Sequence, residues 1–311
     1  MYQKSKILLT TALTTMLLVA PAAYGAEDMT TQEIKDGFRK HAALTQLHRW
    51  YLLYEEPAYG IDNQLDILDA NVALKSGLGE GKGHEQYVER VKQIPTTWKN
   101  AHDVKTTSVT VNDDGSVNLM ANITYLNQGL LENEVVRTAE LTYTTTLKPT
   151  DAVLPKFTSI VIAQDSDGTA EEFVAEYGNN RMRSLVHYWL ALIEDPSRNA
   201  EPVKEILADR FSLNFSSGAI TDFAGFEAWL AGPGSAVIAS THKIGEFNQE
   251  LLESGEYRVS KTFDWNGILP NNAEMTAKTK HTWLVVDDPT KRFAQIKSVD
   301  VEVLEPFKPK G

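Results

Sequence analysis

The chain has 311 residues, a formal net charge of -12 at pH 7 and no cysteine. The lack of thiols excludes disulfides and a lipid anchor linked through sulfur, so the fold must rest on its own hydrophobic cores. The acidic excess, with no run or stripe of lysine and arginine, argues against nucleic acid as a partner, because phosphates are neutralised by clustered cations.

The start of the chain has the pattern of an export signal. A basic start with two lysines precedes an apolar run at residues 7–20, and Ala23-Tyr24-Gly25 places small residues where signal peptidase cleaves. The run is shorter than the roughly 20 apolar residues that span a bilayer. We therefore expect residues 1–25 to be a signal peptide, and the mature protein to begin at Ala26, without stable membrane insertion, in the periplasm or outside the cell.

A pattern in the first half of the chain returns in the second half. Residues 48–57 and 187–196 both read H-x-W-x-x-L-x-E-acidic-P. Later landmarks follow in the same order and at nearly the same offset, with His102 matched by His242, and Tyr125 by Trp265. Self-similarity over so long a stretch predicts a duplicated domain.

The duplication predicts two domains, at residues 28–165 and 169–306. Both lengths agree with the usual size of a domain, about 100–200 residues. Residues 164–168 are polar and end in glycine, which is typical of a linker. We expect each domain to fold around its own core.

Each half is expected to open with a long amphipathic helix. Thr30 and Thr169 are each followed three residues later by glutamate, the spacing of a capping box at a helix start. Apolar residues then recur at helical spacing. Pro57 and Pro196 should end the two helices at equivalent points, because proline disfavours helical conformation in the residue before it.

Shorter elements follow in the same order in both halves. A second helix is expected near residues 64–68 and 202–207, a short strand at 72–74 and 211–213, and a further helix from 83 and from 225. The rest of each half is hairpin and strand, at residues 104–125, 139–142 and 157–162, and again at 244–265, 273–276 and 293–299. Helices first and antiparallel strands afterwards indicate the α+β class.

This order of elements, with a hairpin entered at a His-x-aliphatic step, resembles the SnoaL-like branch of the nuclear transport factor 2-like superfamily. The step is His102-Asp103-Val104 in one half and His242-Lys243-Ile244 in the other, and an aromatic residue follows at the far end of each hairpin. The resemblance implies two tandem cone-shaped domains, each with helices packed against a curved, mainly antiparallel sheet. Members of this superfamily use the enclosed cavity for catalysis, for binding or only for pairing, so the fold does not fix the function.

The two strand histidines, His102 and His242, are the first candidates for a site. Either could hydrogen-bond a ligand in the cavity. Either could also act there as a general base, since the unperturbed pKa of histidine is near neutrality. Either could instead hydrogen-bond nearby backbone and hold the curve of the sheet. We favour the structural interpretation, because duplicated domains keep structural residues in both copies more readily than catalytic ones.

Four aromatic residues at matching positions could line a ligand pocket: Trp50, Tyr125, Trp189 and Trp265. Aromatic side chains at such amphipathic positions are more often plain core, because each buries a large apolar area. Both interpretations stay open for these residues.

Carboxylates offer few catalytic candidates. Enzymes of this superfamily commonly place an acid after the first short strand, where this chain has Lys75-Ser76 and Asn214-Phe215. Asp264 is then the best candidate for a cavity acid; its counterpart is Thr124, so catalysis with His242 would be confined to the second domain.

Two further groups near the helix ends are interpreted as structural. The paired acids Glu55-Glu56 and Glu194-Asp195 are expected to make interdomain or loop contacts. His48 and His187 are expected on the helix surface, where they could pair with Glu55 and Glu194.

The sequence predicts no metal site and no cofactor. His84-Glu85 begins like a zinc-protease motif, but Val88 stands where the second histidine must be. The leading hypothesis is an exported protein that binds a small apolar or amphipathic molecule, or a protein partner, without catalysis. The alternatives are a cofactor-independent isomerase, cyclase or hydrolase using His242 and Asp264, and a structural pseudo-dimer of the two domains.

Overall fold

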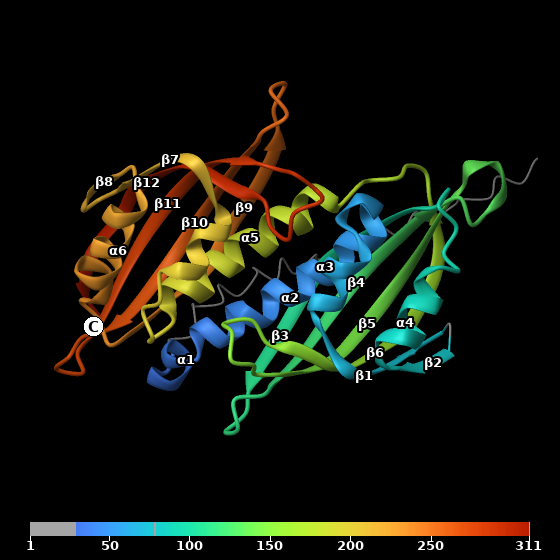
Figure 1. Cartoon of the computed structure of the whole chain (residues 1–311), viewed down its shortest axis with the longest axis horizontal. Helices are drawn as coiled ribbons and strands as arrows, with labels where there is room; N and C mark the ends of the chain where they lie inside the picture. Colours follow the sequence, from blue (N-terminus) through green and yellow to red (C-terminus); the bar gives the residue numbers. More distant parts are fainter. Residues whose placement is uncertain (1–28, 78, 311) are drawn as a thin grey trace, which may run out of the picture.

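The structure, a computed structural model, describes residues 29–77 and 79–310. The predicted signal peptide lies outside these residues. The described chain forms two units that lie side by side, each with one six-stranded sheet and its own helices (Figure 1). Among the described residues, no helix has the length and apolar character needed to cross a bilayer.

The elements of the first domain are α1 (Thr31–Lys35), α2 (Gly37–Glu55), a 3-10 turn (Pro57–Tyr59), α3 (Ile61–Asp66), β1 (Leu68–Ser76), β2 (Gly79–Lys82), α4 (Gly83–Val91), β3 (Lys99–Val111), β4 (Val117–Gln128), β5 (Val136–Lys148) and β6 (Lys156–Ala170). Those of the second domain are α5 (Tyr177–Glu194), a 3-10 helix (Glu201–Ile206), β7 (Leu207–Phe215), β8 (Gly218–Ile220), α6 (Phe223–Ala231), β9 (Ala239–Leu251), β10 (Tyr257–Ile268), β11 (Glu274–Val286) and β12 (Gln295–Pro309).

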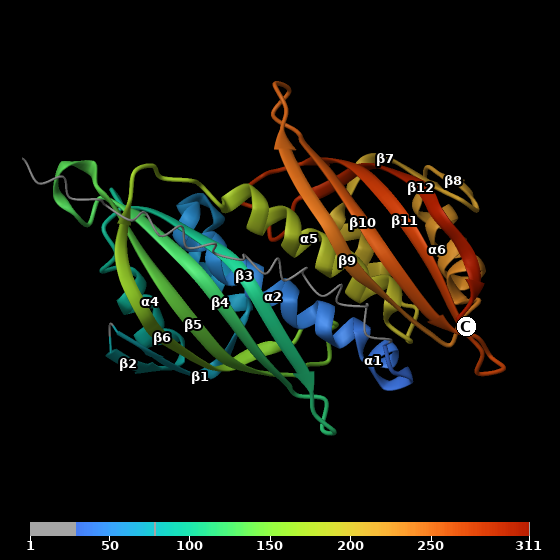
Figure 2. The same cartoon turned by 180° about the vertical axis from the view of Figure 1, so that it is seen from behind.

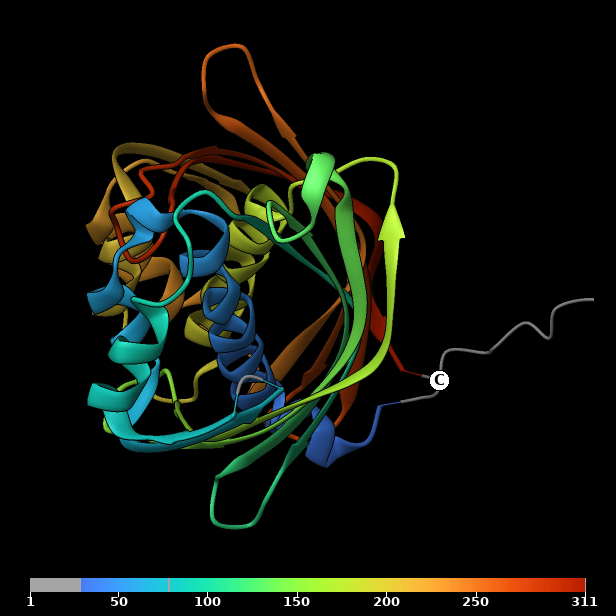
Figure 3. The ribbon, with the colours of Figure 1, turned by 90° about the vertical axis from the view of Figure 1, so that its right-hand side faces the viewer.

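The two sheets have the same topology. Their strand orders are β2-β1-β6-β5-β4-β3 and β8-β7-β12-β11-β10-β9. The β1–β6 and β7–β12 pairs are parallel, and all other pairs in the two sheets are antiparallel. Each sheet curves around the helices of its own domain (Figure 3). The predictions of an α+β duplication and of helices packed against curved, mainly antiparallel sheets are confirmed.

The predicted helix limits are largely confirmed. Thr30 and Glu33 form the capping box at the start of α1, and α2 and α5 end at Glu55 and Glu194, before the prolines. The first helix is interrupted at Asp36, so it is two helices and not one.

The predictions of a linker at residues 164–168 and of a capping box at Thr169 are wrong. Residues 164–168 continue β6 and pair with β5, as does Thr169. The segment is polar because this end of the strand is exposed, where Asp167 forms an ion pair with Arg137. Helix α5 begins only at Tyr177, and no side chain caps it.

Helices α2 and α5 pack against each other at the centre of the molecule, between the two sheets (Figures 1 and 2). Each helix is therefore covered on two sides, by its own sheet and by the other helix. This explains why α2 buries five polar residues as well as its apolar ones: His41, Thr45, Gln46, His48 and Arg49. Burial of polar groups requires hydrogen-bonding partners, and the partners come largely from across the domain boundary or from the loop after α2.

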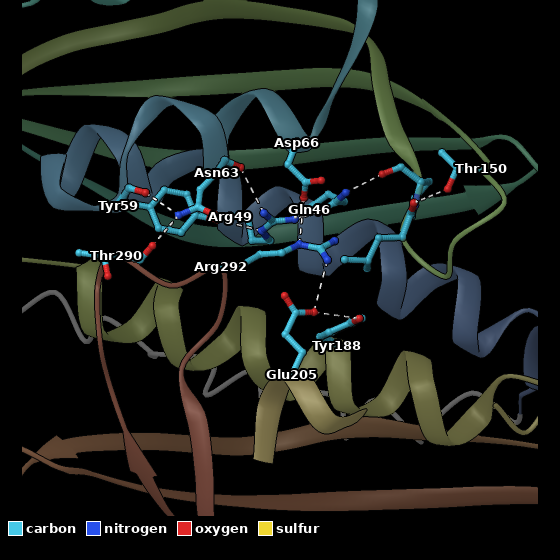
Figure 4. A network of polar contacts seen from close by, with 12 residues as sticks. Gln46, Arg49, Tyr59, Asn63, Asp66, Thr150, Tyr188, Glu205, Thr290 and Arg292 are labelled. Carbon is cyan, nitrogen blue, oxygen red and sulfur yellow. Dashed lines mark hydrogen bonds and ion pairs between the residues drawn. The ribbon is translucent and has the colours of Figure 1, made fainter. Parts of the chain in front are cut away.

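Arg49 is fully buried and satisfies its donors within the first domain (Figure 4). Its guanidinium donates to the Tyr59 hydroxyl at 2.9 Å, the Gln46 side-chain oxygen at 3.0 Å, the Asp66 carboxylate at 2.9 Å and the Asn63 carbonyl at 3.2 Å. A buried charge is tolerated when it is paired and hydrogen-bonded, and here each of the three guanidinium nitrogens has a partner.

The same carboxylate links the two domains. Asp66 also forms an ion pair with Arg292 of the second domain at 2.9 Å, and Arg292 reaches Glu205 at 3.3 Å (Figure 4). Burial opposes ionisation of Asp66, but the Arg49 and Arg292 guanidinium groups outweigh it and lower the pKa of the carboxyl. A charged network of Arg49, Asp66, Arg292 and Glu205 thus links the two domains along one side of the α2–α5 pair.

Candidate functional site

The first domain contains a cavity of about 490 Å³ between its helices and the concave face of its sheet. Its walls are mainly aromatic and aliphatic, with contributions from α2, α4 and strands β1, β3, β4, β5 and β6. The aromatic lining residues are Trp50, Tyr54, Tyr87, Trp98, Tyr125 and Tyr143. Concave, mainly apolar cavities with a few convergent polar groups are the usual form of small-molecule sites.

His102 supplies a polar group to this cavity. It lies on β3 directly opposite Tyr125 on β4, and cross-strand partners share a face of the sheet, so the two predicted residues meet in the cavity with ring centroids 5.1 Å apart. Trp50 lines the same cavity from α2. The structure therefore brings together three of the residues singled out in the sequence.

A carboxylate holds the His102 ring in place. Glu55, at the end of α2, accepts hydrogen bonds from the His102 backbone N–H at 2.8 Å and from Nδ1 at 3.0 Å. The ring also stacks on Tyr51, with centroids 4.6 Å apart. With the proton held on Nδ1, neutral His102 has its lone pair on Nε2, which makes no hydrogen bond to any residue in the described ranges.

Glu55 is buried, and burial raises the pKa of its carboxyl, although hydrogen bonds from His102 and Asn180 oppose the shift. The Asn180 amide comes from α5 of the other domain and donates to the carboxylate at 3.0 Å. Interpreting Glu55 as an interdomain contact was thus correct in part. Its contact with His102 was missed, although the recurrence of the same glutamate at the same point of both helices was a signal for it.

A polar rim surrounds His102. The Tyr125 hydroxyl donates to the Asn100 side-chain oxygen at 2.7 Å, and Asn100 in turn donates to the Tyr54 carbonyl at 3.0 Å. The Tyr54 and Tyr87 hydroxyls share a hydrogen bond of 2.8 Å. Because these groups satisfy one another, Nε2 of His102 is the polar atom of this rim best placed to receive a ligand.

The second domain repeats the histidine–glutamate pair. Glu194, at the end of α5, accepts from His242 Nδ1 and from the His242 backbone N–H, both at 2.8 Å. Trp189, the counterpart of Trp50, is 2 % exposed and contacts Phe226 and Trp283 in the core. The pair is therefore common to both domains, but His102 packs against Tyr51 and Tyr125, whereas His242 contacts Phe263 edge-on.

Asp264 does not lie with His242. Its strand neighbours are Lys243 and Lys278, it forms an ion pair with Lys278 at 3.5 Å, and its side chain is half exposed. Successive residues of a strand point to opposite faces, and it is Trp265 that lies opposite His242. Trp265 packs against Phe307, with ring centroids 5.0 Å apart. The carboxylate next to His242 is Glu194, so the predicted pair of His242 and Asp264 is not formed.

His48 and His187 are not on the helix surface. Both are buried between α2 and α5, because each helix covers the other. His48 Nδ1 hydrogen-bonds Asn180 at 2.8 Å, and His187 Nδ1 lies 2.9 Å from His41 Nδ1.

These contacts form an approximately two-fold arrangement, which we call the seam, made of His41, His48, Glu55 and His102 from one domain and Asn180, His187, Glu194 and His242 from the other. Asn180 lies two helical turns before His187, as His41 lies two turns before His48. Asn180 donates to the His102 carbonyl at 3.0 Å, and His41 Nε2 lies 3.0 Å from the His242 carbonyl. Equivalent residues thus make equivalent contacts across the domain boundary.

Within the described ranges, no group of three or more His, Cys, Asp or Glu side chains is arranged to hold a metal ion. His84, from the motif that resembles a zinc protease, instead has its Nε2 at 3.2 Å from the Leu68 carbonyl.

No protein-family model matches the sequence, and no curated protein matches it. Solved structures are similar to one half of the chain. A hexachlorocyclohexane dehydrochlorinase (LinA) Type2 is 14% identical and covers 45% of this chain and 95% of its own, with a TM-score of 0.40. A putative scytalone dehydratase from Novosphingobium aromaticivorans is 11% identical and covers 47% and 95%, with a TM-score of 0.38.

A nuclear transport factor 2-like superfamily protein from Salmonella enterica serovar Typhimurium is 9% identical and covers 42% of this chain and 93% of its own, with a TM-score of 0.37. Each of these similarities is one of fold and concerns a single domain-sized half of the chain.

Proposed function

We propose that the first domain binds a small, mainly apolar molecule in its cavity, through one polar group that donates a hydrogen bond to His102 Nε2. The observation that supports this most directly is that His102 Nε2 makes no hydrogen bond with the described residues and lies in an aromatic-walled cavity of about 490 Å³. A cavity of this size fits within the usual range for small ligands. Aromatic walls favour a planar or ring-bearing apolar body.

A second candidate is proton transfer on such a molecule, as in a cofactor-independent enzyme. The contact between Glu55 and His102 favours it, because a carboxylate on Nδ1 orients the ring and stabilises the imidazolium that forms when Nε2 takes a proton. This places the proposed chemistry in the first domain and replaces His242 and Asp264, which the structure separates, with His102 and Glu55. The histidine–glutamate pair also links the end of a helix to a strand in both domains. Because this structural role alone would account for the pair, proton transfer requires its own test.

Binding can be tested by filling the cavity. Ile162 on β6 lines the cavity, while its neighbour Val161 is 37% exposed on the opposite face. We expect Ile162→Trp to weaken binding of 2-naphthol by about tenfold or more, roughly 1.4 kcal/mol, and Val161→Trp to leave it unchanged. The measurement is quenching of the cavity tryptophans on titration. Equal affinity in the two variants would refute the proposed site.

The hydrogen bond and the chemistry need separate readouts. His102→Phe should remove the preference for 2-naphthol over naphthalene while retaining apolar binding. For proton transfer, 5-nitrobenzisoxazole is a suitable probe, because its ring opens when a base removes one proton. We expect slow turnover that His102→Gln abolishes and Glu55→Gln reduces; no turnover above buffer in the wild-type protein would exclude the second candidate for this probe class.

We further propose that the protein is exported and that its mature form begins at Ala26, on the strength of the Ala23-Tyr24-Gly25 site in the sequence. Intact-mass measurement of the protein from the cell envelope and the medium tests this. A chain that keeps Met1 to Gly25 there would contradict it.

A further inference from the structure

A second cavity, of about 460 Å³, lies between the two domains. We call it the interdomain cleft. Its lining residues come mainly from α2, α5, β3 and β9, the last two being edge strands of the two sheets. These four elements are neighbours in the view of Figure 2. Its apolar wall includes Leu44, Val104, Val109 and Ile244. It is separate from the cavity of the first domain, which takes its lining from the first domain alone.

The charges around the cleft oppose those of the whole chain. The protein carries a net charge of -12, yet the residues that line the cleft include Lys40, Lys105, Arg183 and Lys243, and no aspartate or glutamate. Two of these cations have partners just outside the lining. Lys105 pairs with Asp103, and Lys40 lies 3.8 Å from Glu33.

The other two cations are less neutralised. Arg183 donates from Nε to the neutral Asn179 side chain at 2.9 Å and stacks over Phe247 at 4.2 Å. Burial lowers the pKa of Arg183, against the opposing effect of the Glu176 and Asp103 carboxylates. Lys243 is exposed at the cleft and forms no ion pair with any residue in the described ranges, because its cross-strand neighbour Asp264 pairs with Lys278 instead, at 3.5 Å.

Four histidines also line the cleft, and the hydrogen bonds fix their tautomers. A backbone carbonyl can only accept, so His41 Nε2 carries a proton toward the His242 carbonyl, and neutral His41 then accepts at Nδ1 from His187. His187 in its neutral form is left with a bare Nε2.

The same reasoning applies to the remaining two rings. The Asn180 amide nitrogen is engaged by Glu55, so its oxygen accepts from His48 Nδ1. His242 Nδ1 donates to Glu194. His48, His187 and His242 therefore each keep an Nε2 lone pair that no residue of the described chain uses.

We propose that the interdomain cleft binds a small organic carboxylate with an apolar body, and that each binding event takes up a proton. Arg183 and Lys243 hold the carboxylate, and Leu44, Val104 and Ile244 contact the apolar body. The proton is shared between the carboxylate and an imidazole Nε2, which turns repulsion between two lone pairs into a hydrogen bond. This site is independent of the function proposed for the first domain.

The direction of the proton uptake follows from the surroundings of the rings. Burial lowers the pKa of His48 to about 3 and that of His242 to about 3, so the rings are neutral near pH 7 before a ligand binds. Arg183 adds to the effect of burial at His48 and His187, and Lys40 adds to it at His41, where Glu194 opposes it. A carboxylate in the cleft favours the protonated ring. Burial raises the pKa of Glu194 to about 7, and a nearby anion raises it further, which also takes up a proton.

The test uses octanoate as the probe and isothermal titration calorimetry with the full chain. Proton uptake should make the affinity rise as the pH falls from 8 to 6, by up to about tenfold per pH unit for each proton taken up. The heat of binding should change with the ionisation enthalpy of the buffer. Binding without either dependence would overturn the proton uptake.

Variants test the location. Lys243→Gln and Arg183→Gln should each weaken octanoate binding by about tenfold, whereas Lys280→Gln, at an exposed lysine of β11, should have no effect. The exposed Lys243 keeps the test valid if Arg183→Gln fails to fold. Ile162→Trp should leave octanoate binding unchanged. Loss of binding in Ile162→Trp, or wild-type affinity in Lys243→Gln and Arg183→Gln, would overturn the cleft as the site.

Discussion

Replacing Arg49 by methionine is expected to lower the free energy of unfolding by about 3–5 kcal/mol. The guanidinium is fully buried, and it satisfies Gln46, Tyr59 and the Asn63 carbonyl while it pairs with Asp66. Methionine fills similar volume but leaves these acceptors without their donor. Asp66 would retain Arg292, so the loss falls mainly on the first domain.

Urea denaturation followed by circular dichroism measures this effect. Arg39 lies on the same helix, and its side chain is 43% exposed with an ion pair to Asp36. Arg39→Met should therefore change stability by at most about 1 kcal/mol, as is usual for an exposed pair. Similar losses in the two variants would contradict a central role for the buried network.

Replacing Lys261 by methionine is expected to do the opposite and stabilise the protein by about 1–4 kcal/mol near neutral pH. Lys261 is 1% exposed, its Nζ makes no hydrogen bond within the described chain, and it lies 3.2 Å from the centroid of the Trp283 ring. Burial lowers the pKa of the amine well below its usual value. Folding must therefore remove a proton that the unfolded chain holds, or bury a charge with only an aromatic face as its partner.

The pH dependence gives the sign of this effect. Below the unfolded pKa of 10.5, the unfolded chain binds more protons at Lys261 than the folded chain, so wild-type stability falls as the pH falls toward the lowered folded pKa. The gain from Lys261→Met should thus be larger at pH 7 than at pH 10. Lys280→Met, at an exposed neighbour on β11, should show neither gain nor pH dependence. A destabilised Lys261→Met would mean that the contact with Trp283 outweighs the cost of burial.

The sequence predicted the fold well where local signals and the internal repeat agree. The prolines after Glu55 and Glu194 ended both central helices, and the turn at residues 113–115 set the β3–β4 hairpin. Residues 164–168 were mispredicted because polar composition marks exposure, and an exposed strand end has the same composition as a linker. Strand pairing over a long distance is what distinguishes the two.

The candidate site was harder to predict because it depends on how helices cross sheets. Strand register alone brings His102 to Tyr125, and the matching positions in the two halves made both visible. That Glu55 reaches His102 depends on where the end of α2 lies over β3, for which the sequence carries no periodic signal. His48 and His187 were assigned to a surface because only the second domain, packed against the first, removes that surface from solvent.

The seam is only approximately symmetric. The difference affects how well the seam's hydrogen bonds would be satisfied if two copies of the same domain were paired. At the position where the second domain has Asn180, the first has His41. The amide of Asn180 donates at once to Glu55 and to the His102 carbonyl, and accepts from His48. Two copies of the first domain would present His41 there instead, and a neutral imidazole has one N–H, which would leave Glu55 short of a donor.

Two copies of the second domain would keep an amide on both sides, with Asn180 facing Glu194, His187 and the His242 carbonyl. In the chemistry of the seam alone, the second domain is therefore the better self-partner and the first depends on its neighbour. Joining the two in one chain raises the effective concentration of the unlike partner. By this argument, the covalent connection favours pairing of the two unlike domains over pairing of two copies of the second.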